Sequence, residues 1–115
     1  MADTLSLAFS ALADPTRRDL LTRLAAGDAT VTSLAEGYDL SLQAVSKHLK
    51  VLETAGLVSK GRDAQRRPVH LEPEVLDLMA GWIRRYQREA EARFRRLDDV
   101  LSTMSGDTAA KEEIA

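Results

Sequence analysis

Hydrophobic positions repeat every three or four residues along the first quarter of the chain, and this spacing predicts two short helices. The first is expected over 4–13. The second should follow at once, because Asp14 is a good N-cap and Pro15 fits the first helical position. It should run to about Ala26, with Gly27 as its stop. Its buried face is expected to consist of Leu20, Leu21 and Leu24.

Two further helices joined by a tight turn are predicted in the stretch that follows. Thr32 is interpreted as the N-cap of the first, and the turn falls at 37–40. Ser41 is interpreted as the N-cap of the second, which should run to Thr54 and be closed by Gly56. Helical spacing assigns four residues of this helix to the core: Leu42, Val45, Leu49 and Leu52.

The pattern changes after residue 56, where short β-prone runs replace the helical spacing. The runs 57–60 and 69–71 flank a polar turn over 61–68, and together they predict a two-stranded hairpin. Pro68 has no N–H to donate to a ladder, so it is expected at an exposed edge of this hairpin.

A long amphipathic helix is predicted from Pro73 to Met104, since apolar residues are again three or four positions apart. Residues 105–115 lack any apolar period, which favours a disordered tail. The expected architecture is therefore one domain over 1–104, mainly α-helical with a small β-hairpin, followed by this tail.

Charge is distributed unevenly along the chain. The formal net charge of all 115 residues is −2. Residues 41–70, however, hold six basic side chains against two acidic ones, a net of +4, and the segments on either side are acidic. A local basic stripe suits contact with phosphates, while an acidic remainder limits nonspecific binding to nucleic acid.

The polar face of the fourth predicted helix points away from its core positions. Glutamine can form two hydrogen bonds with adenine, lysine can reach guanine or phosphate, and an alanine methyl can meet the methyl of thymine. Taken alone, such a face is typical of the solvated side of any amphipathic helix. With the tight turn before it and the basic hairpin after it, the face predicts contact with DNA. The candidate contacts are Ser41, Gln43, Ala44, Ser46, Lys47 and Lys50 on this helix and Arg62, Arg66 and Arg67 on the hairpin.

Three stretches of the chain resemble the ArsR family of bacterial transcriptional regulators. They are ALADPTRR at 11–18, SLQAVSKHLKVL at 41–52, and AGLV at 55–58 with a hairpin that begins at Gly61. The resemblance covers roughly residues 5–100. It implies a winged helix-turn-helix homodimer, usually a repressor that blocks a promoter and leaves the DNA when an inducer binds.

The same resemblance places the start of the second helix against the DNA backbone. Thr16 and Arg17 are therefore candidate phosphate contacts, and an ion pair of Arg17 with Asp14 or Asp19 is the alternative. At the hairpin, the three arginines are expected to enter a minor groove or contact phosphates, with an ordinary charged turn as the alternative.

The sensing residues of the family do not carry over to this chain. Metal-sensing members place a Cys-X-Cys pair where this chain has residues 30–32 (Thr-Val-Thr), and the chain contains no cysteine. Other members place Asp and His ligands on the last helix, and here no histidine follows His70. No metal or other cofactor is therefore expected, and the inducer is unidentified. His70 is interpreted as a strand residue. His48 is interpreted as a group hydrogen-bonded at the edge of the core, with a phosphate contact or a pH switch as alternatives.

The apolar stripe of the last predicted helix extends further than a small winged core can cover. Its first part, 75–79, is expected to pack on that core. The remainder is expected to bury against the N-terminal helix and the same helix of a second subunit, with a pocket for an apolar ligand as the alternative. The candidate interface residues are Leu5, Phe9, Trp82, Ile83, Tyr86, Ala90, Phe94, Leu97 and Leu101.

The sequence thus predicts a regulator that binds double-stranded DNA at an imperfect palindromic operator as a homodimer, most simply a repressor. An activator or dual regulator, or a winged-helix module that binds a protein, are the alternatives. No arrangement of a nucleophile with a base is found, so an enzyme is not expected. The absence of a signal peptide and of a membrane-spanning stretch predicts a cytoplasmic protein.

Overall fold

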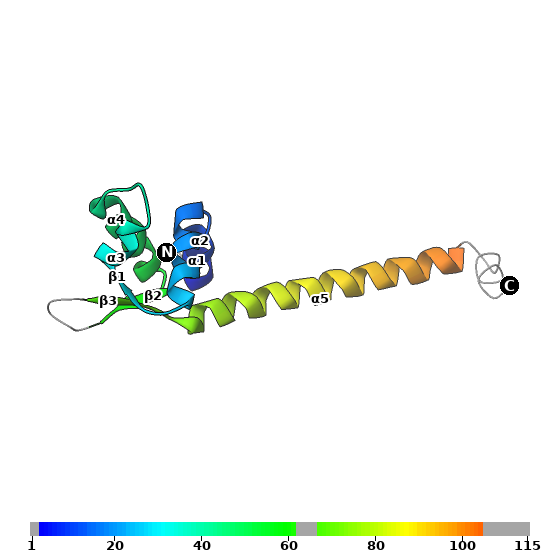
Figure 1. The fold of residues 1–115 in the computed structure, drawn as a ribbon. Helices are drawn as coiled ribbons and strands as arrows, with labels where there is room; N and C mark the ends of the chain where they lie inside the picture. The colour runs from blue at the N-terminus through cyan, green and yellow to red at the C-terminus, as the bar shows by residue number, and fades with distance from the viewer. Residues whose placement is uncertain (1–2, 62–66, 105–115) are drawn as a thin grey trace. The chain divides into compact units, whose positions relative to one another are not determined.

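The computed structural model of the chain describes residues 3–61 and 67–104. Within them, five helices and three short strands follow one another (Figure 1). In chain order they are α1 (Thr4–Ala11), α2 (Pro15–Ala25), β1 (Ala29–Thr30), α3 (Val31–Glu36), α4 (Leu42–Thr54), β2 (Val58–Lys60), β3 (Pro68–Leu71) and α5 (Pro73–Met104). The chain forms two compact units that divide between Met79 and Ala80. The predicted tail over 105–115 lies outside the described residues.

N-cap side chains fix the first residues of α2 and α4, as the sequence predicts. The carboxylate of Asp14 accepts a hydrogen bond from the backbone N–H of Arg17 at 3.0 Å, with Pro15 as the first residue of α2. The hydroxyl of Ser41 accepts one from the N–H of Ala44 at 3.1 Å. Each cap satisfies one of the amide groups that a helix N-terminus leaves without a partner.

The third helix begins earlier than predicted. Its N-cap is Thr30, whose side chain accepts a hydrogen bond from the N–H of Ser33 at 3.1 Å, so the assignment of the cap to Thr32 is wrong. The reason is that Thr30 is also the last residue of β1, and its extended backbone is the conformation that an N-cap requires.

The sheet has three antiparallel strands rather than the two of the predicted hairpin. Their order is β1-β3-β2, so β3 is central and Pro68, opposite Thr30, is not at an edge of the sheet. The sheet tolerates this proline because it is the first residue of its strand. Its carbonyl also accepts a hydrogen bond from the N–H of Gly61 at 2.8 Å, which closes the base of the hairpin.

A single hydrophobic core joins the helices α1–α4, the sheet and the first turns of α5. Its largest fully buried side chains are Leu20, Leu49, Leu52, Leu57, Val45 and Val69. Leu42 is the exception among the predicted core positions, since 51% of it is exposed. It is the first residue of α4, and because helical side chains lean toward the N-terminus, its side chain extends past the layer on which α4 packs.

Gly56 turns the chain from α4 into β2, as predicted for the closing residue of this helix. Its φ of 79° lies in the left-handed region. The N–H of Leu57 donates to the carbonyl of Leu52 at 2.9 Å and the N–H of Gly56 donates to that of Glu53 at 3.0 Å. These two bonds form a Schellman motif, which glycine adopts without steric strain.

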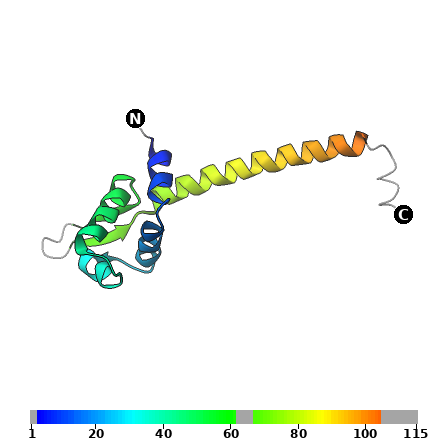
Figure 2. The ribbon, with the colours of Figure 1, turned by 90° about the horizontal axis from the view of Figure 1, so that it is seen from above.

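The last helix is continuous from Pro73 to Met104 (Figure 2). Its first turns pack on the core through Val75 and Leu76, and Met79 is buried, as predicted. None of the helices within the described residues is both long enough and apolar enough to cross a membrane.

Candidate nucleic-acid interface

The helices α3 and α4, with the turn between them, form the predicted helix-turn-helix unit. Leu34 buries α3 in the same core as Val45 and Leu49 of α4. Because these contacts fix the inner side of α4, the opposite side of this helix is left facing outward.

A polar cluster attaches the turn between α3 and α4 to α2. The hydroxyl of Tyr38 donates to the carboxylate of Asp19, which also accepts from Arg23 at 3.1 Å. The guanidinium of Arg23 lies 4.2 Å from the centre of the Tyr38 ring and donates to the carbonyl of Gly37 at 3.3 Å. Burial of Tyr38 and its bond to Asp19 raise the pKa of this tyrosine to about 12. A Cβ on residue 37 would lie 1.9 Å from the Arg23 guanidinium, so only glycine leaves this cluster undisturbed.

The outer side of α4 carries the candidate DNA contacts that the sequence singles out. Gln43, Lys47 and Lys50 are exposed and form one row, spaced four and three residues apart. Ala44 and Ser46 flank the row and are partly buried. Ser41 is exposed, but its hydroxyl is engaged as the cap of the helix. The row therefore presents one amide and two ammonium groups on long side chains.

The row of α4 continues into a basic hollow beside the wing strands β2 and β3. This open depression is lined by Lys50, Glu53, Lys60, Gly61 and Arg67. The ammonium of Lys50 lies 3.7 Å from the carboxylate of Glu53, so one acidic group stands among three basic ones. In this hollow, α4 and the wing present positive charge together. Lys60 was not among the predicted contacts, although its place in the basic segment 41–70 was a usable signal.

Of the three wing arginines, Arg67 is exposed and directly precedes β3. Arg62 and Arg66 lie outside the described residues.

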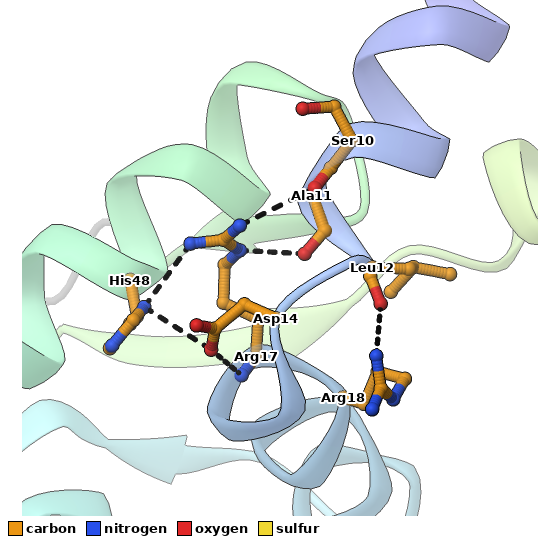
Figure 3. Close-up of polar contacts among 7 residues, drawn as sticks. All are labelled: Ser10, Ala11, Leu12, Asp14, Arg17, Arg18 and His48. Carbon is orange, nitrogen blue, oxygen red and sulfur yellow. Dashed lines mark hydrogen bonds and ion pairs between the residues drawn. The ribbon is translucent and has the colours of Figure 1, made fainter.

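The corner between α1 and α2 arranges Arg17 in a way that the sequence did not predict (Figure 3). Its Nε donates to the carbonyl of Ala11 at 2.6 Å, and its Nη2 donates to that of Ser10 at 3.3 Å. Its Nη1 lies 3.4 Å from Nδ1 of His48 on α4. Asp14 contacts Arg17 through the backbone N–H rather than through the guanidinium, and that hydrogen bond is the main reason why the pKa of Asp14 is lowered.

The two histidines lie where the sequence analysis expects them, His48 at the edge of the core and His70 on a strand. His48 is partly buried, with Nδ1 between Arg17 and the carboxylate of Asp14, 3.8 Å away, which confirms its position at the edge of the core. His70 is an exposed residue of β3 whose Nδ1 lies 2.8 Å from the carboxylate of Asp28. The hydrogen bond to Asp28 raises the pKa of His70. Among the described residues, no three His, Cys, Asp or Glu side chains are grouped so that they could hold a metal ion.

The candidate dimer contacts differ in exposure. Leu5 on α1 packs partly against the core, and Phe9 is 37% exposed. Beyond residue 80, α5 exposes a stripe of large apolar side chains, and the rings of Trp82 and Tyr86 stack along it with centroids 5.5 Å apart. The exposed candidates on this helix are Trp82, Ile83, Tyr86, Phe94, Leu97 and Leu101, and Ala90 is partly buried.

Comparison with known proteins matches these features to a family. A helix-turn-helix domain model matches residues 12–60, which span α2 to β2. The HTH-type transcriptional regulator Rv2034 of Mycobacterium tuberculosis is 40% identical over 92 residues, covering 80% of this chain and 86% of that protein. The transcriptional repressor SdpR of Bacillus subtilis is 36% identical over 75 residues, covering 65% of this chain and 83% of that protein.

Solved structures agree with the sequence relatives. An ArsR-like transcriptional regulator from Rhodococcus superposes with a TM-score of 0.77 at 30% identity, covering 84% of this chain and 92% of that chain. A homodimeric winged helix-turn-helix DNA-binding domain from Mycobacterium bovis superposes with a TM-score of 0.61 at 26% identity, covering 78% and 84%. The two sequence relatives are named as regulators of transcription, in agreement with the sequence analysis. The chain therefore belongs to the ArsR family of winged helix-turn-helix transcriptional regulators.

Proposed function

We propose that the chain is a homodimeric repressor that binds double-stranded DNA in a sequence-specific manner, with α4 as its reading helix. The observation that carries this proposal is the exposed row of α4, which leads from Gln43 through Lys47 to Lys50 and into the basic hollow beside the wing. A helix in the major groove needs flexible polar side chains on its outer face and phosphate contacts at its margins, and this surface offers both.

The residues of this surface divide by their chemistry. Gln43, Ser46 and Lys47 are proposed to contact base edges, and Ala44 to meet a thymine methyl. The basic groups of the hollow and of the wing are proposed to contact phosphates or enter the minor groove, and Thr16, in the first turn of α2, to contact the DNA backbone. The proposed phosphate and minor-groove contacts are Lys50, Lys60, Arg62, Arg66 and Arg67.

The homodimer is proposed to form along α5 beyond Ala80. Residues on this part of the helix repeat with alternating steps of three and four, the spacing of a coiled-coil seam. The seam consists of Ala80, Ile83, Gln87, Ala90, Phe94, Leu97, Leu101 and Met104. Seven of these eight positions are apolar. The exposed fraction of the large apolar side chains on the single chain ranges from 43% for Ile83 to 77% for Met104. Pairing with a second copy would remove that apolar surface from water. Leu5, Phe9, Trp82 and Tyr86 are proposed to complete the interface.

Two reading helices related by a twofold axis would lie about one DNA turn, ~34 Å, apart, so the operator is proposed to be an imperfect palindrome. Repression is supported by the relative that is named as a transcriptional repressor. The inducer is proposed to be something other than a metal bound through cysteine, because the chain contains no cysteine.

Selection of bound duplexes from a random pool by the purified protein tests the proposal. We expect an enriched inverted repeat with half-sites centred about 10 base pairs apart. Transcription in vitro from a promoter that overlaps this site should fall when the protein is added, whereas a rise would indicate an activator. Failure to enrich any duplex would contradict DNA recognition and favour a protein partner for the same surface.

Two variants then separate base reading from phosphate contact. Gln43→Ala should cost about 1–3 kcal/mol on the selected site and relax the preference at one base position. Lys50→Met should weaken binding to every sequence and reduce the slope of log affinity against log salt by about 0.9. Arg85→Gln, a matched loss of one positive charge on the outer side of α5, should leave that slope unchanged. An equal loss on all sequences for Gln43→Ala would rule out its base-reading role.

A further inference from the structure

We infer that Arg17 is a positioning residue that joins the end of α1 to the reading helix α4, rather than one of the phosphate contacts. This inference rests on the proposed function, since it concerns how the DNA-reading face of α4 is held in place. It follows from the three directions in which the guanidinium donates hydrogen bonds (Figure 3).

Arg17 lies beside the C-terminal end of α1. The last carbonyl groups of a helix have no partners within that helix, and a cation beside them is favoured by the helix dipole. Arg17, in the first turn of α2, supplies hydrogen-bond donors and a positive charge at this helix end. Its Nε donates to the carbonyl of Ala11 at 2.6 Å, and its Nη2 donates to the carbonyl of Ser10 at 3.3 Å. The neighbouring Arg18 donates to the carbonyl of Leu12 at 2.7 Å. The corner between α1 and α2 is therefore closed by these two arginines.

Arg17 also contacts α4. Nη1 of Arg17 lies 3.4 Å from Nδ1 of His48, a residue 31 positions later in the chain. When the imidazole carries its proton on Nε2, Nδ1 is free to accept this hydrogen bond. His48 stands between the exposed Lys47 and the buried Leu49, so a displacement of His48 also displaces the side chain proposed to contact DNA beside it.

Most N–H donors of the Arg17 guanidinium are engaged within the protein. A guanidinium presents its N–H donors in a rigid planar fork. Here Nε, Nη1 and Nη2 are each directed at a protein group, and the residue is partly buried. Three of the five N–H donors are therefore engaged, and a phosphate that used these three would require the fork to turn away from α1 and His48. Because α1 also carries Phe9, a proposed interface residue, Arg17 connects a helix that contributes to the proposed interface with the helix proposed to read DNA.

Binding measurements on Arg17→Met test this inference. Methionine keeps much of the side-chain length but donates no hydrogen bonds. We expect affinity for the selected operator to fall roughly tenfold, within the usual range of coupling between sites. Affinity for a scrambled duplex and the salt slope should stay as in the wild type, because no phosphate contact is lost. A slope reduced by about 0.9, with parallel losses on operator and scrambled DNA, would identify Arg17 as a phosphate contact and overturn the inference. Lys50→Met is the matched variant expected to show that pattern.

Spectra of the free protein provide a test that does not depend on DNA. In ¹H–¹⁵N correlation spectra, Arg17→Met should shift amide signals at the end of α1 and along α4 around His48. Unchanged α4 signals would overturn the inference, and a stability loss with an unchanged ratio of operator to scrambled affinity would reduce Arg17 to a structural residue only. If the wild type bound no duplex, the proposed function would fail while these spectra still decided the role of Arg17.

A second variant keeps the test available if Arg17→Met does not fold. His48→Ala removes the contact of α4 with Arg17, together with the 3.8 Å approach of His48 to Asp14, and leaves the bonds from Arg17 to α1 in place. We expect it to lower the ratio of operator to scrambled affinity in the same way. In the double variant the two effects should be smaller than their sum, as is expected of residues in one network. Additive effects would show that the two side chains act independently and would contradict the coupling.

Discussion

The same substitution at two glycines should change stability in opposite directions. Gly56 has a φ of 79°, in the left-handed region, and a Cβ built on it would lie 3.1 Å from Cγ2 of Val75. Gly81 lies inside α5, and a Cβ built on it meets nothing within 4 Å. Gly56→Ala therefore adds a methyl group where the backbone conformation strains an L-residue. Gly81→Ala adds the same group where the backbone is helical and unstrained.

The magnitudes follow from the backbone at each site. An L-residue in the left-handed conformation costs about 1–2 kcal/mol, and at Gly56 the Val75 side chain must also move. We therefore expect Gly56→Ala to lower the free energy of unfolding by about 1–2 kcal/mol or more. In a helix interior, alanine is favoured over glycine by about 1 kcal/mol. Gly81→Ala should therefore raise the free energy of unfolding by up to that amount.

Urea unfolding followed by circular dichroism measures both changes. All three proteins must be compared at one concentration, because formation of the proposed dimer would make apparent stability depend on it. For a denaturant slope of about 1–3 kcal/mol per molar urea, Gly56→Ala should lower the midpoint by about 0.3–2 M, and Gly81→Ala should raise it. An unchanged or higher midpoint for Gly56→Ala would refute the left-handed turn at the end of α4. A lower midpoint for Gly81→Ala would show that another segment or subunit packs closely on that face of α5.

Three further predictions concern the wing, the seam and the core. Because the hydrogen bond to Asp28 raises the pKa of His70, their interaction stabilises the folded state fully below about pH 6.5 and is lost as pH rises through the raised value. The difference in urea midpoint between wild type and His70→Gln should shrink accordingly from about pH 5.5 to pH 9, and a constant difference would argue against the pair. Gln87→Leu, which makes the proposed seam fully apolar, should lower the dimer dissociation constant by ~10-fold in sedimentation equilibrium. Arg85→Leu, on the outer side of the same helix, should leave that constant unchanged, and equal effects would place the seam elsewhere. Leu49→Ala removes a side chain with 0% exposure and should destabilise the fold by about 2.7–5 kcal/mol in urea melts. A cost under about 1 kcal/mol would show that α4 does not pack on the core through this residue.

Much of the fold could be predicted from the sequence because it depends on interactions between near neighbours. The caps Asp14 and Ser41 bond to amides three residues away, and the turn at Gly56 closes on the last turn of its own helix. The long helix α5 follows from its regular apolar spacing in the same way. The exposed row of α4 could also be predicted, because fixing Val45 and Leu49 in the core leaves only one side of a helix for Gln43 and the lysines.

Other features were decided by the tertiary structure. The two residues of β1 are too few to show a period, and they form a strand only because β3, some 40 residues later, pairs with them. That pairing makes β3 central, moves Pro68 from the expected edge to the first position of a paired strand, and turns Thr30 into a cap.

The same holds for the candidate site. Lys60 and Arg67 join Lys50 in one hollow only when the wing folds back beside α4. Arg17 is directed at α1 and His48 because three helices meet at that corner. The sequence by itself thus determined which segments are helical and which face of α4 is exposed. Contacts between residues distant in the chain were decided by the tertiary structure, because they depend on how all the segments pack together.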